Sequence, residues 1–185
     1  MSLTLLWPSR EYLPGYVAAL ERGWSPDNLR SEVAREHLER ISADADAFLA
    51  SLVDKDATGD PIRLPDGVVV PRLPGYHRWM WDGEFCGSIN FRWQPGTEAL
   101  PPHCLGHIGY AVVPWKQRRG YATIALREMI KEARKERLRY VEIVTDPTNV
   151  ASQRVVEANG GMLVERFIKP QAYGSRPGLR YRIIL

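Results

Sequence analysis

Residues 106–123 of the 185-residue chain read GHIGYAVVPWKQRRGYAT. The first half is an apolar run of strand length, and the second half is a cation-rich turn that leads into an amphipathic helix. A glycine and a run of backbone N–H groups at a helix start, beside arginines, form a site suited to phosphate. We therefore expect a strand over 107–113, a phosphate-binding turn, and a helix over 122–133.

The turn matches neither of the two common phosphate-binding loops. It lacks the second glycine and the Lys-Ser/Thr pair of the ATP-type loop, and it lacks the Gly-x-Gly-x-x-Gly of dinucleotide folds. It contains instead the pattern Gln-x-x-Gly-x-Ala, filled by Gln117, Gly120 and Ala122. This pattern resembles the pyrophosphate loop of the GCN5-related N-acetyltransferase (GNAT) superfamily, which binds acetyl-CoA.

The other predicted elements follow the order found in that superfamily. Runs rich in β-branched and aromatic residues predict strands, and apolar residues three and four apart predict helices. We expect strands over 4–7, 68–70, 76–81, 85–93, 107–113, 140–145, 162–168 and 179–185, and helices over 11–22 (or only the part after Gly15), 25–41, 45–52, 122–133 and 149–158. The resemblance implies a mixed α/β, GNAT-type fold, in which helices flank a mostly antiparallel twisted sheet that is splayed at its fourth and fifth strands.

Local signals set several of these boundaries. Ser25-Pro26 is expected to begin the second helix, because serine caps a helix and proline fits its first position; Leu29 is the first apolar residue of that helix. Asp82-Gly83 predicts a hairpin turn, and 56–65 is polar enough to predict a loop. Asn159-Gly160-Gly161 predicts the end of the last helix.

Size and composition exclude several classes of protein. A chain of 185 residues fits one domain over 1–185, and 44% apolar with 25% charged residues is ordinary for a soluble protein. The net charge of +3 is too small to predict nucleic-acid binding. No apolar run approaches the roughly 20 residues that span a membrane. Without an export signal, the expected compartment is the cytoplasm, where Cys86 and Cys104 are expected to be buried, reduced thiols.

The resemblance also implies a set of coenzyme-binding residues. The strand before the loop lies along the pantetheine arm and polarises the thioester carbonyl through a backbone amide. The loop and the helix start bind the pyrophosphate, and a later Asn-x-x-Ser helix meets the pantetheine and the thiol. The residues in these positions are Ala111, Val112, Val113, Gln117, Arg118, Arg119, Gly120, Tyr121, Ala122, Thr123, Asn149 and Ser152.

His107 is the candidate catalytic base. By resemblance it occupies the position at which the histone acetyltransferase branch carries its glutamate base, and the usual pKa of histidine, near 6.5, suits proton acceptance. The competing interpretation is a histidine whose hydrogen bonds are satisfied beside the sheet. His103 is a weaker candidate, and Tyr110 is expected to be packing or pocket wall rather than an acid.

Ser152 is the candidate proton donor to the leaving thiolate. Many family members carry a tyrosine acid four residues beyond this position, where this chain has Val156. Either Ser152, which resembles the serine of the ribosomal-protein and N-terminal acetyltransferase branch, donates the proton, or no dedicated acid exists. A thiol with a pKa near 8.5 leaves tolerably well without help.

These features predict an acetyl-CoA-dependent N-acetyltransferase, in which a primary amine attacks the thioester directly in a ternary complex. The alternative is a catalytically reduced coenzyme A-binding module or sensor. No spacing of histidines and cysteines predicts a metal site. The sequence leaves open the acceptor, which can be a small amine or an amine of a peptide or protein, and whether the chain forms a homodimer.

Overall fold

The computed structural model describes residues 3–28, 30–64 and 66–185. Its strands form two main sheets whose pairs are antiparallel. The larger sheet has the order β1-β5-β6-β7, with β2 beside β5, and the smaller has the order β8-β10-β9. The larger sheet consists of β1 Thr4–Leu6, β2 Val53–Asp54, β5 Gly75–Trp81, β6 Phe85–Arg92 and β7 Ile108–Val112; the smaller consists of β8 Tyr140–Thr145, β9 Met162–Ile168 and β10 Pro177–Ile184.

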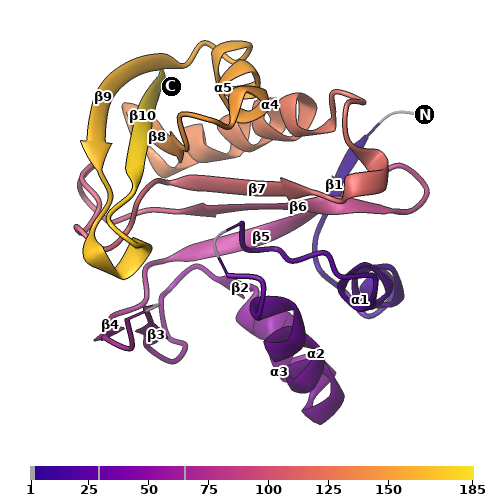
Figure 1. Ribbon diagram of the computed structural model, residues 1–185. Coiled ribbons are helices and arrows are strands. Elements are labelled where there is room, and N and C mark those ends of the chain that lie inside the picture. The colour runs from indigo at the N-terminus through magenta and orange to yellow at the C-terminus, as the bar shows by residue number, and fades with distance from the viewer. Residues whose placement is uncertain (1–2, 29, 65) are drawn as a thin grey trace.

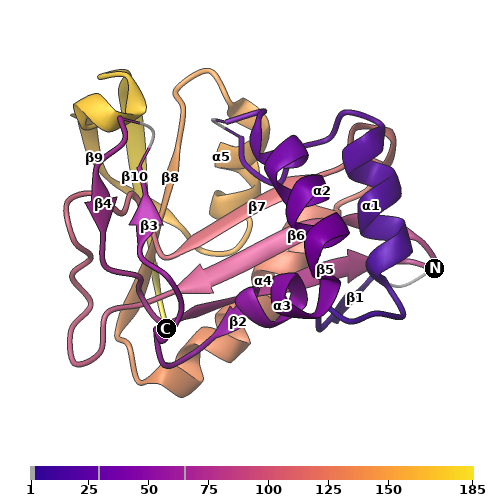
Figure 2. The same cartoon turned by 90° about the horizontal axis from the view of Figure 1, so that it is seen from below.

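Helices cover both faces of the larger sheet (Figure 1). On one face lie α1 Leu13–Glu21, α2 Val33–Ala43 and α3 Ala45–Ser51, which Figure 2 shows in front of the sheet. On the other face lie α4 Tyr121–Ala133 and α5 Val150–Glu157. Short 3₁₀ turns, η1 Pro114–Lys116, η2 Arg134–Glu136 and η3 Gln171–Tyr173, and a small hairpin of β3 Ile62–Arg63 and β4 Val69–Val70 complete the described elements.

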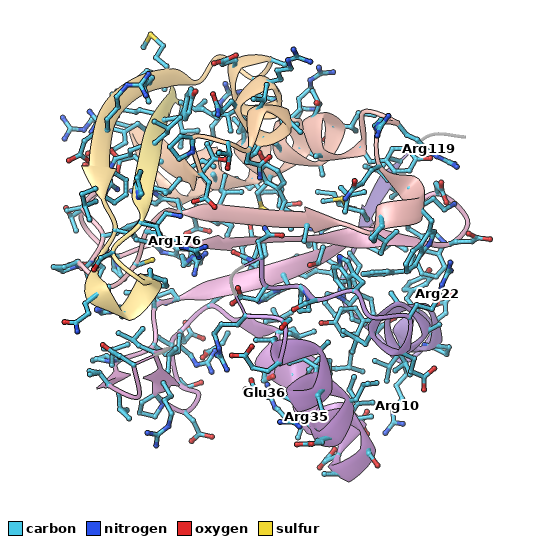
Figure 3. The ribbon with its side chains drawn as sticks, in the orientation of Figure 1. Arg10, Arg22, Arg35, Glu36, Arg119 and Arg176 are labelled. Carbon is cyan, nitrogen blue, oxygen red and sulfur yellow. The ribbon has the colours of Figure 1, made fainter. Side chains whose placement is uncertain are left out.

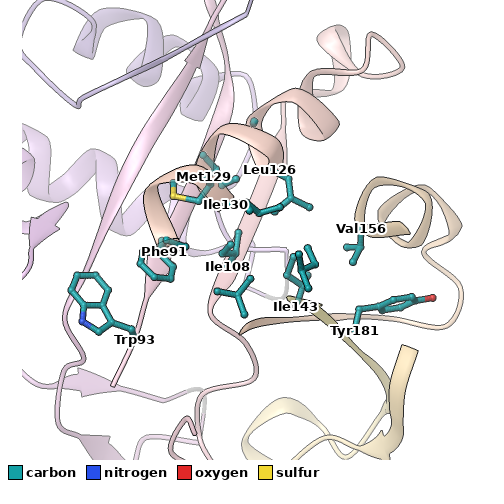
Figure 4. Packing of buried hydrophobic residues seen from close by; sticks show 14 of the residues in the cluster. Phe91, Trp93, Ile108, Leu126, Met129, Ile130, Ile143, Val156 and Tyr181 are labelled. Atoms are coloured by element: carbon teal, nitrogen blue, oxygen red, sulfur yellow. The ribbon is translucent and has the colours of Figure 1, made fainter. Parts of the chain in front are cut away.

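Each covered face has its own apolar core. On the α4 side, Leu126 and Met129 are fully buried, and together with Ile130 they face Phe91 and Ile108 of the sheet (Figure 4). Their spacing of three and four residues is the one that predicts this helix from the sequence. On the α1 side the core is aromatic, with the Tyr16 ring stacked on the Trp79 ring at a centroid distance of 4.8 Å. The sheet is therefore held rigidly between two packed layers.

The larger and smaller sheets meet between β7 and β8 and then diverge. When the two-residue strands are left out, these are the fourth and fifth strands of the chain. No ladder joins them within residues 3–28, 30–64 and 66–185. The expected mixed α/β fold with a splayed, antiparallel sheet is thus confirmed.

One expected helix boundary is wrong, and for another the structure decides between the two expected alternatives. Helix α2 begins at Val33 rather than at Ser25-Pro26, because the Ser25 hydroxyl is used in a turn: it accepts from Asp27 N–H at 3.2 Å and donates to the Arg30 carbonyl at 3.0 Å. The expected first apolar residue of this helix, Leu29, lies outside the described residues. Helix α1 begins before Pro14, which takes a first-turn position where its missing N–H needs no partner.

Smaller differences affect the segment before the main hairpin. The expected loop over 56–65 includes the two-residue strand β3, which pairs with β4; Pro65 lies outside the described residues.

The hairpin turn at Asp82-Gly83, the strand over 140–145 and the Asn149 cap of α5 occur as expected. Both cysteines are free thiols, as expected, but Cys104 is only half-buried. None of the described helices is both long and apolar enough to cross a membrane.

Removing the Leu126 side chain tests the α4 core. Leu126→Ala leaves a cavity under a fully buried position, so we expect the free energy of unfolding to fall by about 2–5 kcal/mol. Ile168→Ala, at a β9 position that is 64% exposed, is the control and is expected to change stability by less than about 0.5 kcal/mol. Chemical denaturation followed by circular dichroism measures both. Equal losses in the two variants would contradict this packing.

Candidate active site

The two sheets separate at His107. Its backbone N–H donates to the Glu142 carbonyl of β8 at 2.8 Å, and its carbonyl accepts from Arg92 of β6. Its ring continues the contact, because Nδ1 accepts the Glu142 N–H at 3.0 Å. Gly106 permits this approach, since a Cβ there would lie 3.0 Å from the Glu142 carbonyl oxygen. Beyond this point β7 has an open edge, which we call the split edge (residues 108–112).

Backbone groups of two β7 residues point to the split edge. The N–H of Val113 and the carbonyl of His107 bond to β6, so strand alternation turns the backbone groups of Tyr110 and Val112 the other way. The Tyr110 carbonyl accepts from Asn28 Nδ2 at 3.1 Å, and the Val112 carbonyl accepts from Gln117 Nε2 at 3.4 Å. Of the three predicted coenzyme-binding residues 111–113, at and just after the end of β7, the structure therefore brings Val112 to the split edge.

The two neighbouring residues of that prediction face elsewhere. Ala111 and Val113 pair with β6 through their backbones. Their side chains are buried in the aromatic core on the α1 side. Any contact of theirs with a ligand at the split edge would have to be indirect.

The turn between η1 and α4 has the form of an anion-binding loop. Arg118 and Gly120 both have left-handed backbones, with φ of 60° and 76°. Added at Gly120, a Cβ would meet nothing within 4 Å, so the space above the loop is open. No described side chain caps α4, and its first helical bond runs from Ile124 N–H to the Gly120 carbonyl. The N–H groups of residues 121–123 are therefore available to a phosphate.

The predicted loop residues lie together at this helix start. Gln117, Arg118, Arg119 and Gly120 are exposed, Ala122 and Thr123 are half-buried, and Tyr121 is buried. Figure 3 shows Arg119 at the outer end of the loop, away from the core. Asn159, at the end of α5, donates to the Thr123 carbonyl at 3.2 Å and so fixes the first turn of α4 to the neighbouring helix.

Asn149 and Ser152 lie at the start of α5. The Asn149 Oδ1 accepts from Ser152 N–H at 3.0 Å, which is a side-chain helix cap. The Ser152 hydroxyl is 2.9 Å from the Tyr110 hydroxyl, which reaches across from β7. Burial raises the pKa of Tyr110 to about 12, so this phenol stays protonated at neutral pH and can donate. The two hydroxyls thus bridge the two sides of the split.

Sequence reasoning missed Tyr110 as a partner of Ser152. Strand alternation did indicate the direction of its side chain. Tyr110 lies on the same face of β7 as Ile108 and Val112, and this face packs against α4 and α5. Val156, in the position of the absent tyrosine acid, is fully buried in that core (Figure 4). A hydroxyl at the split therefore comes from β7 instead of from the last turn of α5.

Asp82 was also missed, since the sequence marks it only as a turn residue. It is 8% exposed, and a cavity of about 450 Å³ adjoins it at the start of α4. The residues that line this cavity are Asp82, Gly83, Glu84, Lys116, Arg119 and Tyr121. A buried carboxylate beside a phosphate-binding turn would be unfavourable unless cations and donors satisfy it.

His107 is fully buried, and burial lowers its pKa to about 4. Because Nδ1 accepts a backbone N–H, the neutral ring must carry its proton on Nε2. Nε2 is buried without a hydrogen-bond partner in the part of the chain that the structure describes. Neither nitrogen then has a free lone pair, so the base role of His107 stays a prediction that requires the ring to release Glu142 first.

Comparisons with known proteins show the family and the fold of the chain. The model of the acetyltransferase (GNAT) domain family matches residues 22–162, and the chain belongs to this family of acetyltransferases. No curated protein matches the chain.

Solved structures of acetyltransferases share the fold. The microcin C7 self-immunity acetyltransferase MccE, in complex with acetyl-CoA and AMP, has a TM-score of 0.63 at 14% identity over 99% of this chain and 92% of that one. The ribosomal L7/L12 α-N-protein acetyltransferase RimL, in complex with coenzyme A, has a TM-score of 0.62 at 16% identity over 100% and 95%. A GNAT-family acetyltransferase from Bacillus anthracis has a TM-score of 0.60 at 16% identity over 100% and 95%.

Burial of neutral His107 predicts a loss of stability in acid. Its pKa is about 4 when folded and near 6.5 when unfolded, so the unfolded chain binds the extra proton and stability falls as the pH drops through this window. Between pH 7.5 and 5 the loss is roughly 2 kcal/mol from this group. Denaturant unfolding at the two pH values measures it.

The variant for this test is His107→Asn, whose amide oxygen can still accept the Glu142 N–H. We expect a smaller difference in stability between pH 7.5 and 5 than in the wild-type protein. His103→Asn, in the loop before β7, is the matched control and is expected to keep the wild-type difference. An unchanged pH dependence in His107→Asn would show that the buried ring is not the source of the acid sensitivity.

Proposed function

We propose that residues 1–185 form a single acetyltransferase domain that transfers an acetyl group from acetyl-CoA to a primary amine. One observation carries the proposal: the open strand edge of β7 is followed in the chain by the uncapped start of helix α4. Residues 113–120 connect the two. A long ligand with amides in its middle and a diphosphate at one end matches both.

Each part of the coenzyme has a place in this proposal. The pantetheine arm lies along the split edge, where its amides pair with backbone groups of Tyr110 and Val112. The diphosphate lies on the loop at Arg118–Gly120 and on the first N–H groups of α4. The Asn149 side chain caps α5 through the Ser152 N–H, and we assign it to the pantetheine arm by the family resemblance.

The thioester then lies near the Val112 N–H, which polarises its carbonyl as a preorganised donor. The amine attacks the carbonyl carbon directly and releases a proton to water, the C–S bond breaks, and the thiolate takes a proton from the Ser152 hydroxyl. With Tyr110 as the donor in its 2.9 Å hydrogen bond to Ser152 Oγ, the Ser152 proton is free for the sulfur; Tyr110 then reprotonates Ser152, and a proton from water restores the phenol. This hydroxyl pair favours an enzyme over a catalytically reduced coenzyme-binding module.

Binding of the donor is the first test. Titration calorimetry with acetyl-CoA is expected to show one site with a Kd in the micromolar range. Release of free thiol, followed with a chromogenic disulfide, is then measured against a panel of small amines and peptides. An absence of binding at high micromolar acetyl-CoA would remove the proposal, and binding without thiol release for any amine would favour the binding module.

The hydroxyl pair is tested by two substitutions. Ser152→Ala is expected to lower kcat by roughly 10- to 100-fold, at the low end for an acid because thiolate is a fair leaving group. Tyr110→Phe removes the donor behind Ser152 and is expected to have a smaller effect in the same direction. KM for acetyl-CoA should change little in both. Full turnover in Ser152→Ala would exclude this serine as the acid.

A further inference from the structure

One carboxylate holds both ends of the turn that precedes α4. Asp82 lies at the tip of the β5–β6 hairpin, far from this turn in the sequence. The Tyr121 hydroxyl donates to its Oδ2 at 2.5 Å, and the Lys116 ammonium donates to both of its oxygens at 3.0 Å. Lys116 ends η1 and Tyr121 begins α4, so the Asp82 side chain is hydrogen-bonded to the residues on both sides of the segment 117–120.

Burial alone would raise the pKa of Asp82. The hydrogen bonds from Tyr121 and Lys116, together with the Glu84 N–H, outweigh burial and hold the pKa of Asp82 well below its usual range. The carboxylate is therefore charged at neutral pH. A charged group that is 8% exposed needs such partners to be tolerated, and the three contacts are strong because they are charge-assisted.

The same contacts divide the cations of the turn into two groups. Lys116 is neutralised by Asp82 and, at 3.1 Å, by Glu84. Arg118 and Arg119 form no ion pair with any described residue and are exposed. Without Asp82, Lys116 would keep only the exposed carboxylate of Glu84, and its charge would be less well compensated beside Arg118 and Arg119. With it, Lys116 is an anchor, Arg119 hydrogen-bonds the Tyr121 hydroxyl, and neither arginine has an ion pair among the described residues.

We propose that Asp82 is a positioning residue that holds the 117–120 segment in its anion-binding conformation before coenzyme A arrives. The inference rests on the proposed function, because it assigns the loop to the diphosphate. Asp82 touches no phosphate itself. It keeps the left-handed backbones of Arg118 and Gly120 and the open N–H groups of α4 in place, so that binding does not have to order the loop.

The test compares coenzyme A with pantetheine, which lacks the diphosphate. In Asp82→Asn we expect the Kd for coenzyme A to rise at least 10-fold and the Kd for pantetheine to stay within two-fold of wild type. A merely destabilised protein would weaken both ligands together. A folded Asp82→Asn protein with wild-type affinity for coenzyme A would overturn the proposal.

Glu84→Gln is the matched control, since it lies on the same hairpin and contacts the same lysine but does not touch Tyr121. Its Kd for coenzyme A should stay within two-fold of wild type. Should Asp82→Asn fail to fold, Tyr121→Phe carries the test, because it keeps the Asp82–Lys116 pair and releases only the helix end. We expect a 3- to 10-fold rise in its Kd for coenzyme A, and an unchanged Kd would contradict the proposal.

Hydrogen exchange without ligand separates failure of this inference from failure of the proposed function. The N–H groups of Gln117 and Ile124, which bond to Pro114 and Gly120, should exchange faster in Asp82→Asn than in wild type. If wild type does not bind coenzyme A, the proposed function fails while the exchange still reports on the loop. Unchanged exchange at both positions would show that Asp82 does not order it.

Discussion

The site depends on the contact between His107 and Glu142, where the larger and smaller sheets are joined before they diverge. A backbone N–H and a ring nitrogen of one residue satisfy the carbonyl and the N–H of the other. Two strands that part inside a protein leave backbone groups without partners, and such groups are unfavourable when buried. The contact confines that cost to the residues beyond it, where an extended ligand can replace the missing strand.

The same contact explains why a histidine occurs at this position. Burial keeps the His107 ring neutral, so its Nδ1 can accept the backbone N–H of Glu142. An aliphatic side chain at this position could not accept that hydrogen bond. Gly106 brings β7 close enough for the first bond, and the ring supplies the second. The point at which the sheets part is thereby fixed by two adjacent residues of one strand, Gly106 and His107, through hydrogen bonds to Glu142 of the other sheet.

Much of the fold follows from patterns within single segments. The alternation and β-branching of 140–145, the spacing of apolar residues in α4, and the Asn149 cap each depend on residues near in sequence, and these expectations agree with the structure. The loop before α4 is likewise recognisable, because Gly120 and its neighbours form a local conformation. Ser25 shows the limit: the same side chain that caps helices also closes turns, and only the surrounding contacts decide between the two.

The parts of the site that the sequence did not reveal are pairs of residues distant along the chain. Nothing near Asp82 marks it as the partner of Lys116 and Tyr121. Alternation along β7 places Tyr110 on the face toward α4 and α5, but it does not identify Ser152 as the partner.

These two pairs also divide the work of the proposed site. A contact that orders the diphosphate loop acts equally on the bound substrate and the transition state, so it changes affinity; a donor to the departing sulfur acts only as charge develops, so it changes turnover. In the proposed site, the Asp82 hairpin acts at the diphosphate end of the coenzyme and the Tyr110–Ser152 pair acts at its thiol end, so binding and chemistry would be adjusted separately.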